Sequence, residues 1–329
     1  MTGVDRAAYE LVRRGAAAVP APRDAVEVAG PDAAEYLQGQ CSQDLDVLDD
    51  GGSAEALLLS PQGKLQALVR VTRLAGDRWV VDVDAGWGDT VVARLLQFRL
   101  RVKADVAPLP WRTVALRGPG VADLLPPGGA PPGTAVVAPV SWAGVTGVDL
   151  LGPDPQMPDG VTEVPAPVWE AVRVEAGIPR MGAELDERTI AAEAGLLDRA
   201  VSFTKGCYTG QELVARLDAR GNRVARRLCG VVVAQGAPRP ASGWVVAVGD
   251  RVVGACTSVA DAPALGTVAA LAYVHRDVEP PSAVSLHPVA EGRTVAGGGV
   301  SAVAEVRVLP LVDPGRAAGE PVFAAPEGR

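Results

Sequence analysis

Glycine and proline constrain the fold of this chain most strongly. The 329 residues include 38 glycines and 28 prolines, which interrupt regular structure and favour turns. Aromatic residues make up only 4% of the chain, so small aliphatic side chains must fill the core. A chain of this length usually forms two or three domains. We therefore expect a multidomain, turn-rich protein with a large share of β-structure.

The N-terminal third alternates between helical and strand patterns. Residues 30–45 predict a turn and a short helix, and residues 53–73 predict a hairpin. Residues 78–86 predict another strand, followed by a helix with Asp89 as its N-cap. Residues 98–106, FRLRVKADV, alternate strictly between apolar and charged side chains. That alternation predicts a strand with one solvated face.

The rest of the chain changes character near Leu228. Before it, residues 168–177 and 187–197 carry helical patterns. After it, short Val-rich segments predict strands, including a hairpin that turns at Gly249 and Asp250. The last hundred residues therefore predict a small all-β barrel or sandwich. Together with the earlier segments, this indicates an α+β protein.

Charge and hydropathy exclude several classes of protein. The formal net charge is -8, which argues against a generally basic nucleic-acid binder. The N-terminal stretch MTGVDRAAYELVRRG mixes charges throughout and lacks the apolar run of a secretory signal. No window approaches 18 uncharged apolar residues, so no membrane span is expected. We expect a cytoplasmic protein.

The cysteines and histidines predict no metal site. The four cysteines are widely spaced and form no CxxC pair, which fits reduced thiols better than a disulfide framework. The two histidines, His275 and His287, lie apart from any Cys or carboxylate cluster. Cys41, Cys229 and Cys256 have apolar or unremarkable surroundings, and we expect them to be structural.

The stretch KGCYTGQE, residues 205–212, carries the densest set of reactive side chains in the sequence. Gly206 and Gly210 flank the cysteine and favour an irregular loop that a ligand can approach closely. The following QELVARLDA suits a helix, so Cys207 is expected just before a helix N-terminus, where unpaired N–H groups carry partial positive charge. That charge and the ammonium of Lys205 would favour the thiolate. The alternative is a buried cysteine acting as a small hydrophobic residue.

A basic cluster follows this stretch. In ARLDARGNRVARR, only Asp218 opposes five positive side chains. Guanidinium groups bind carboxylates and phosphates in bidentate fashion, which would make the cluster an anion site. A solvated helix face is the alternative. The arginines are Arg216, Arg220, Arg223, Arg226 and Arg227.

Several segments together resemble a known family. RVEAGIPRMGAEL, IAAEAGLLDRAVSFTKGCYTGQELVAR and VVGACTSVADAPALGTVAALAYV, in that order, are similar to the YgfZ-type folate-binding proteins, which belong to the superfamily of the glycine-cleavage T protein. DAAEYLQGQCSQDL and LSPQGK are similar as well, and the resemblance runs from about Asp24 to Val312. The family signature K-G-C-Y-x-G-Q-E is matched at Lys205, Gly206, Cys207, Tyr208, Gly210, Gln211 and Glu212.

The resemblance implies a three-part fold, with two α/β portions and a small C-terminal β-barrel around a central folate cavity. It divides the chain into a discontinuous first domain, residues 1–48 plus 112–226, a second domain, 49–111, and a barrel domain with a mobile tail, 227–329. It also implies tetrahydrofolate, or a derivative, as cofactor. Iron–sulfur client enzymes, including tRNA-modifying ones, or assembly factors are the implied partners. Cys207 is the residue on which this family's activity depends.

The resemblance also suggests folate contacts. Glu175 matches a glutamate that contacts the pterin ring in the T protein, and a carboxylate can accept two N–H bonds from an aminopyrimidine edge. A helix-surface glutamate is the alternative for this residue. Arg173 and Arg216 are candidates for binding the glutamate tail of folate.

One departure separates this chain from the T protein. The T protein has a catalytic aspartate in a Gly-x-x-Asp-Asp-Leu segment, whereas GKLQALV has Gln66 and Ala67 at those places. Without that carboxylate, nothing evident in the sequence orients folate for methylene transfer. Aminomethyl transfer is therefore disfavoured and stays the alternative function.

Three functions remain open at the level of sequence. The favoured one is a folate-binding accessory protein for assembly, repair or maintenance of iron–sulfur clusters, working through the Cys207 thiol without ordinary turnover. The second is a tetrahydrofolate-dependent one-carbon transferase in which the thiol acts as nucleophile. The third is a partner-binding scaffold with a vestigial cavity. Direct, tight nucleic-acid binding is not expected at this net charge.

Overall fold

The computed structural model describes residues 3–126, 129–289 and 300–313. The predicted mobile tail lies, beyond Asp313, outside the described residues. The helices are α1 (Arg6–Arg14), α2 (Ala33–Gln40), α3 (Gly88–Phe98), the 3-10 helix η1 (Pro119–Leu124), α4 (Ala166–Ala176), α5 (Leu197–Ala200) and α6 (Gln211–Asp218).

The described strands form two open sheets and one closed barrel. The strands are β1 (Ala17–Val19), β2 (Arg23–Ala29), β3 (Ser53–Leu59), β4 (Leu65–Arg73), β5 (Arg78–Asp84), β6 (Asp105–Leu109), β7 (Arg112–Arg117), β8 (Val136–Trp142), β9 (Val145–Gly152), β10 (Thr162–Glu163), β11 (Arg226–Val233), β12 (Val245–Val248), β13 (Arg251–Ala262), β14 (Thr267–His275), β15 (Ser282–His287) and β16 (Ala302–Arg307).

The first sheet has the strand order β10-β1-β7-β9-β8. All its neighbours are antiparallel except β1 and β10, which run parallel. Helices α1 and α4 cover its β1 end, where Tyr9 and Val12 join Ala171 and Val172 in one apolar cluster. Of these two helices, α4 borders the candidate site through Trp169 and Arg173.

The second sheet has the order β3-β4-β5-β2-β6, with every neighbour antiparallel. Helices α2 and α3 cover one face, where Leu37 and Leu95 pack on Val26, Val69 and Val81. Strand β2 belongs to this sheet because its register matches β5 and β6, although it precedes residue 48. The domain boundaries themselves stay a prediction.

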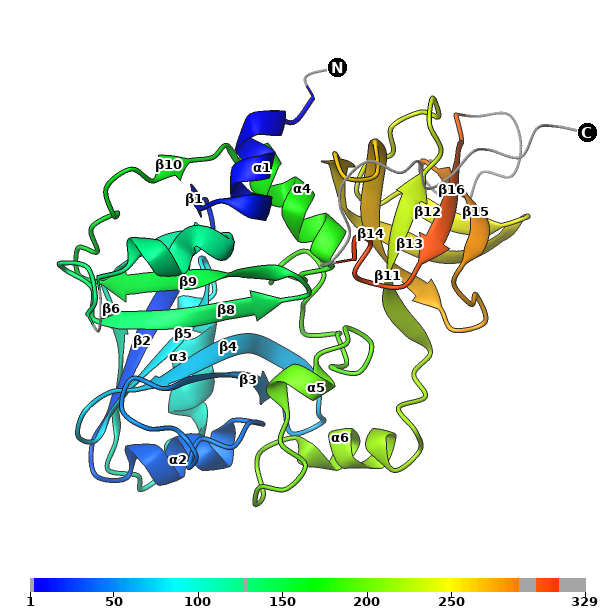
Figure 1. Ribbon diagram of the computed structural model, residues 1–329. Coiled ribbons are helices and arrows are strands. Elements are labelled where there is room, and N and C mark those ends of the chain that lie inside the picture. Colours follow the sequence, from blue (N-terminus) through cyan, green and yellow to red (C-terminus); the bar gives the residue numbers. More distant parts are fainter. Residues whose placement is uncertain (1–2, 127–128, 290–299, 314–329) are drawn as a thin grey trace, which may run out of the picture.

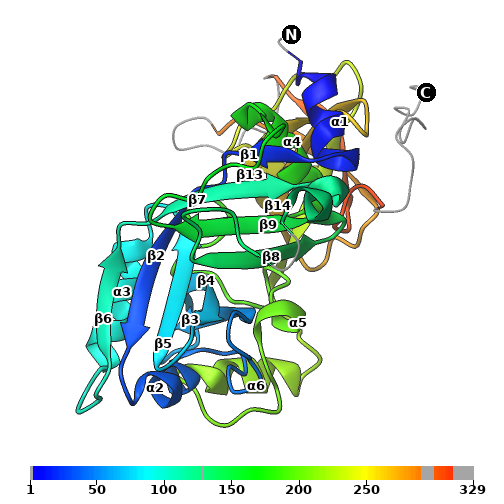
Figure 2. The same cartoon turned by 60° about the vertical axis from the view of Figure 1, so that its left-hand side comes forward.

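The C-terminal strands close into a barrel in the order β11-β14-β13-β12-β15-β16, which confirms the predicted barrel. The two sheets lie face to face, and the barrel stands beside them with α4 at the junction (Figures 1 and 2). Val174 of α4 packs on Val232, Ala260 and Leu271 of the barrel. The described part of the chain has no helix long and apolar enough to cross a membrane.

The predicted strand at residues 98–106 is wrong. Helix α3 extends to Phe98, and β6 begins only at Asp105. Between them Arg101 has φ of 60°, a left-handed conformation that interrupts a strand. The Lys103 N–H donates to Asp32 Oδ2 at 2.7 Å instead of to a neighbouring strand. Leu100 is 82% exposed, so its place in the alternating pattern marks no buried face.

The predicted helix at residues 187–197 is also wrong. Residues 187–196 form turns and irregular structure, and the short helix α5 begins only at Leu197. The carbonyls that would propagate the helix are used elsewhere: Thr189 O accepts from Leu65 N of β4, and Glu193 O accepts from Leu228 N of the barrel strand β11. Gly195, with φ of 69°, ends the turn. Tertiary partners override helix propensity here. The N-cap of α3 is Trp87, not Asp89, which lies in the first turn.

Candidate functional site

A cavity of about 370 Å³ lies between the two sheets. This volume falls within the range of small-molecule sites. Its walls come from both sheets, from α4 and from the segment that follows α4. Described residues of the barrel are not among the lining residues, which are Pro20, Ala21, Pro22, Arg23, Glu55, Leu68, Val69, Arg70, Asp84, Ala85, Arg117, Val140, Trp142, Asp149, Trp169, Arg173, Ile178, Pro179, Arg180 and Met181.

A buried ion-pair network joins the two sheets at one wall of the cavity. Arg70 of β4 binds Asp82 through two bonds of 2.9 and 3.0 Å. It also binds Asp149 of β9 at 2.9 Å. Arg117 of β7 lies 2.7 Å from the other oxygen of Asp149, and Arg23 of β2 pairs with Asp82. Burial by itself raises the pKa of Asp149, but the arginines outweigh burial and hold that pKa at about 2. The network is charged at neutral pH, and it ties the sheets together.

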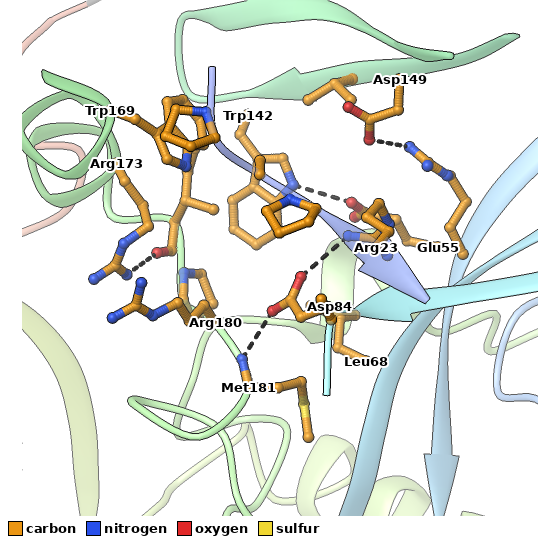
Figure 3. Close-up of a pocket in the computed structure, with 18 of the residues that line it drawn as sticks. Arg23, Glu55, Leu68, Asp84, Trp142, Asp149, Trp169, Arg173, Arg180 and Met181 are labelled. Carbon is orange, nitrogen blue, oxygen red and sulfur yellow. Dashed lines mark hydrogen bonds and ion pairs between the residues drawn. The ribbon is translucent and has the colours of Figure 1, made fainter. Parts of the chain in front are cut away.

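Two indole rings form the aromatic part of the cavity wall (Figure 3). Trp142 of β8 donates its Nε1–H to Glu55 Oε1 of β3 at 3.0 Å. Trp169 of α4 has the guanidinium of Arg117 5.5 Å from its ring centroid. Both rings are half-buried, so they retain surface toward a ligand. Such rings suit a flat heteroaromatic group.

Positive charge lines the opposite wall. Arg173 is 2% exposed, and its guanidinium binds Glu170, Glu184 and Ser258. Arg180 is 54% exposed, and its nearest carboxylate oxygen, on Glu170, is 3.6 Å away. Arg180 therefore has donors left for an anionic group.

Asp84 lines the cavity between these two walls. Its Oδ2 accepts from Met181 N at 2.9 Å, and its Oδ1 lies 3.1 Å from Arg23 Nη1 (Figure 3). The side chain is 35% exposed, so the carboxylate keeps free lone pairs on the cavity side.

Cys207 lies in an exposed loop directly before α6, as expected. We call residues 203–210 the thiol loop. The loop has no helix or strand, and Phe203 and Cys207 are both exposed. The other cysteines, Cys41, Cys229 and Cys256, are 2% exposed or less and fit the predicted structural role. Cys207 is not among the cavity-lining residues, so the thiol and the cavity are separate features.

Lys205 points its ammonium at carbonyl groups of the last turn of α2 and of the segment after it. Its Nζ donates to the main-chain oxygens of Gln38, Cys41 and Gln43 at 2.7–2.8 Å, and to Gln38 Oε1 at 3.1 Å. These bonds give Lys205 a structural role, and its support of the thiolate stays a prediction. Lys205 fastens the thiol loop to residues 38–43.

Tight backbone packing holds the other end of the loop. Gly210 has φ of 83°, and a Cβ there would lie 2.5 Å from Ser60 O in the β3–β4 turn. Gly206, in contrast, has open space around it. The loop also closes on itself, since Gln211 Oε1 accepts from Tyr208 N at 2.8 Å. The segments GQCSQDL, LSPQGK and KGCYTGQE, distant in sequence, therefore meet in one cluster.

The remaining signature residues flank this cluster. The Tyr208 ring is half-buried against the core of the second sheet, and burial raises its pKa to about 12. Glu212 is exposed in the first turn of α6, where a carboxylate favours the helix N-terminus. Arg216 is exposed on the same helix, away from the cavity lining.

Glu175 lies on the barrel side of α4, fully buried. Its Oε2 accepts from Tyr9 OH at 2.5 Å, and its Oε1 accepts from Ala264 N at 3.1 Å. Burial raises the pKa of this carboxyl against the lowering effect of these bonds. Glu175 does not line the cavity, whereas Arg173, two residues earlier, does. A folate contact for either residue stays a prediction.

Sequence reasoning missed most of the residues that line the cavity. Arg70, Asp82 and Asp149 are charged residues at buried strand positions, and no sequence motif marks them. A charged residue inside an otherwise apolar strand is the available signal, because such a residue is buried only with a partner. Among the residues that the structure describes, no group of three or more His, Cys, Asp or Glu is arranged to hold a metal ion.

Comparison with known proteins relates this geometry to a family. The glycine cleavage T-protein C-terminal barrel domain matches residues 226–313, the barrel strands described above. The chain is 30% identical to an iron-sulfur cluster assembly factor IBA57 homolog, mitochondrial, of Chaetomium globosum, over 60% of this chain and 52% of that protein. It is 28% identical to the tRNA-modifying protein YgfZ of Pectobacterium atrosepticum, over 59% of this chain and 63% of that protein.

A solved structure matches the whole arrangement. The aminomethyltransferase T of the glycine cleavage system from Bartonella henselae superimposes with a TM-score of 0.74 at 21% identity, covering 94% of this chain and 89% of that one. At this identity the likeness concerns the fold. In the two relatives named above, the chain spans about half to two thirds of their length. Barrel, fold and relatives together confirm the resemblance: residues 226–313 match the T-protein barrel domain, the fold is that of the T protein, and the chain is similar to YgfZ-type proteins.

Proposed function

We propose that this protein is a folate-binding accessory protein for the assembly, repair or maintenance of iron–sulfur clusters in client enzymes. The observation that carries the proposal is the separation of two features within one T-protein fold. One is a ligand-sized cavity between the sheets, and the other is an exposed cysteine on a loop that side-chain bonds tie to residues 38–43. The similarity to an iron-sulfur cluster assembly factor and to a tRNA-modifying protein supports the same role.

The residues of the cavity fit tetrahydrofolate. Trp142 and Trp169 offer faces on which a flat pterin ring can stack. The carboxylate of Asp84 keeps lone pairs for the N–H groups of an aminopyrimidine edge. Arg180, half-exposed, is suited to the carboxylates of a glutamate tail. Bound tetrahydrofolate would supply a carrier for one-carbon groups.

The position of Cys207 favours action on a partner over action on folate. The thiol faces solvent and is not part of the cavity lining. Its neighbours Phe203 and Gly206 are exposed as well, which leaves room for another protein to approach. We propose that Cys207 is the working residue of the protein and that iron–sulfur enzymes, including tRNA-modifying ones, or their assembly factors are the partners. The cytoplasmic location stays a prediction.

A folate-dependent one-carbon transferase is the second candidate, favoured by the likeness to an aminomethyltransferase structure. Gln66 of β4 bears on this alternative. Side chains alternate along a strand, so Gln66 shares a sheet face with Leu68 and Arg70, which both line the cavity. An amide at that place cannot act as the carboxylate base of the T protein. This supports the accessory role over transfer.

The test combines binding with complementation. Titration calorimetry with folinic acid, a stable tetrahydrofolate derivative, is expected to give saturable binding that weakens in Trp142→Ala. Cells lacking the endogenous homologue should regain iron–sulfur enzyme activity with wild-type protein and not with Cys207→Ser, whereas Cys229→Ser is the matched cysteine control. Full complementation by Cys207→Ser would overturn the thiol's role. Turnover of methylene-tetrahydrofolate with an acceptor would favour the transferase.

A further inference from the structure

A chain of hydrogen bonds and ion pairs joins the cavity wall to the thiol loop, although Cys207 does not line the cavity. Its centre is Arg199 of the short helix α5. This residue belongs to neither feature, but it contacts the cavity wall directly and is linked to the thiol loop through Gln43 and Lys205. The following inference rests on the proposed function in that the cavity ligand is a folate.

At the cavity end, Arg199 holds two lining residues. Its Nε and Nη2 lie 2.9 and 2.7 Å from Glu55 Oε2, and its guanidinium carbon lies 3.7 Å from the ring centroid of Trp142. Glu55 in turn accepts from Trp142 Nε1. Arg199 Nη1 donates to Ser141 O at 2.9 Å, next to Trp142. A ligand that contacts Trp142 or Glu55 therefore acts on the immediate partners of Arg199.

At the other end, the same short helix is bonded to the segment that carries the thiol loop. Gln43 Nε2 donates to Arg199 O at 3.2 Å, and Ser42 Oγ donates to Ala200 O at 2.5 Å. Lys205 Nζ donates to Gln43 O at 2.8 Å, and Ser202 N donates to Ser42 O at 2.9 Å. Only a few bonds separate the Arg199 side chain from the loop that presents Cys207.

The thiol loop is the part of this chain of contacts that is able to shift. Residues 201–210 lie between α5 and α6 without helix or strand, so side-chain bonds to residues 38–43 set their position. Segments with few regular hydrogen bonds open at lower free energy than packed strands. The cavity wall, in contrast, consists largely of sheet strands.

We propose that Arg199 is a positioning residue that couples the cavity to the thiol loop, so that occupation of the cavity by a folate changes the accessibility of Cys207. Glu55 and Trp142 line the cavity and contact Arg199, so a ligand that displaces either side chain also displaces Arg199. Residues 42 and 43 and the ammonium of Lys205 transmit the shift to the loop. A cysteine that does not touch the folate would thereby respond to it.

The experiment measures the rate of Cys207 labelling by N-ethylmaleimide in the full-length native protein, with and without saturating folinic acid. The other three cysteines are buried, so the fast phase reports Cys207. Folinic acid is expected to change this rate by about fivefold or more in wild type, the lower end of measured couplings. Arg199→Met should reduce the ratio to about one, and Arg199→Lys should restore part of it. Glu55→Gln, which keeps the shape, should behave like Arg199→Met.

Arg73→Met is the matched control. Arg73 also pairs with a carboxylate, Asp50, lies over an indole ring, Trp79, and donates to a main-chain carbonyl, but it does not line the cavity or touch the loop. It should leave the folate effect unchanged. Calorimetric binding without any change in wild-type labelling would overturn the coupling while leaving the proposed function intact. Absence of binding would overturn the proposed cofactor. In that case the labelling rates without ligand test the positioning role. A rate that differs from wild type in Arg199→Met but not in Arg73→Met would support this role, and equal rates in all three proteins would overturn it.

Discussion

The cavity wall and the thiol loop differ in how their charged side chains are compensated. At the cavity wall, Arg70 and Arg117 are buried and pair with the buried carboxylate of Asp149. At the loop, the ammonium of Lys205 donates to neutral carbonyl oxygens, and within the described part of the chain it forms no ion pair. The first arrangement fixes two sheets against each other, whereas the second fixes a loop and leaves its cysteine free.

This difference matches the two proposed roles, in which the cavity wall holds a ligand and the thiol loop contacts a partner protein. A buried ion-pair network has a defined geometry because each partner lost would leave a charge uncompensated in the interior. A loop tied by one long side chain keeps its exposed residues accessible. The following changes test whether the two regions behave in this way.

Asp149→Ala is expected to have the largest effect. It leaves two guanidinium groups without their shared carboxylate, and breaking a buried pair typically costs about 3–5 kcal/mol of unfolding free energy. Urea unfolding measures the cost. Asp105→Ala is the matched control, since Asp105 also pairs with an arginine but its side chain is 96% exposed. Equal costs for the two variants would contradict the role given to the network.

The same carboxylate predicts a dependence on pH. Its pKa is lowered from the ordinary 3.8 to about 2 in the fold, so its ionised form is favoured by folding. The stabilisation is present above the unfolded value and is lost as the pH falls from about 4 to about 2. Unfolding free energy measured across this range should therefore fall less steeply in Asp149→Asn than in wild type.

Lys205→Met is expected to rank next. It removes the donor shared by the carbonyls of Gln38, Cys41 and Gln43, and hydrogen bonds to a charged group are worth about 1.5–3 kcal/mol. Hydrogen exchange should accelerate at the Ser202 and Thr209 amides, which bond to the same segment. Lys64→Met, which loses a single exposed bond to Arg188 O, is the control. Unchanged exchange would mean that the loop is held by other contacts.

The two signature glycines are expected to differ. Gly210→Ala puts a Cβ 2.5 Å from Ser60 O at a φ of 83°, and the left-handed backbone alone costs an alanine roughly 1–2 kcal/mol. Gly206→Ala meets open space and should be close to neutral. Thermal unfolding of the two variants measures whether each glycine is required for backbone packing. A large cost at Gly206 would point to a conformational demand in the loop.

Cys207→Ser is expected to have the smallest effect on stability, within about 0.5 kcal/mol, as for other exposed positions. It should nevertheless abolish the fast phase of maleimide labelling in the native protein. If a fast phase remained in Cys207→Ser, one of the buried cysteines would be reached through local opening. Cys256→Ser should leave that phase unchanged, because Cys256 is buried in the barrel.

The sequence predicted local features well and long-range pairing poorly. The hairpin of β3 and β4, the helix α6 after Cys207 and the barrel strands follow from patterns over ten or so residues. The strand expected at residues 98–106 and the helix expected at 187–197 failed, because Asp32, Leu65 and Leu228 supply competing partners from distant segments. The pattern of a single segment carries no information about such partners.

By itself, the sequence predicted an all-β C-terminal part, a loop around Cys207 before a helix, and the resemblance to YgfZ-type proteins. These depend on local periodicity, on glycines and on a contiguous signature. Only the tertiary structure decided that Lys205 binds carbonyls, that Glu175 turns away from the cavity and that Arg70, Arg117 and Asp149 form one of its walls. Each of these depends on which strands and helices are brought face to face, because hydrogen bonds and ion pairs act over a few ångströms whatever the separation along the chain.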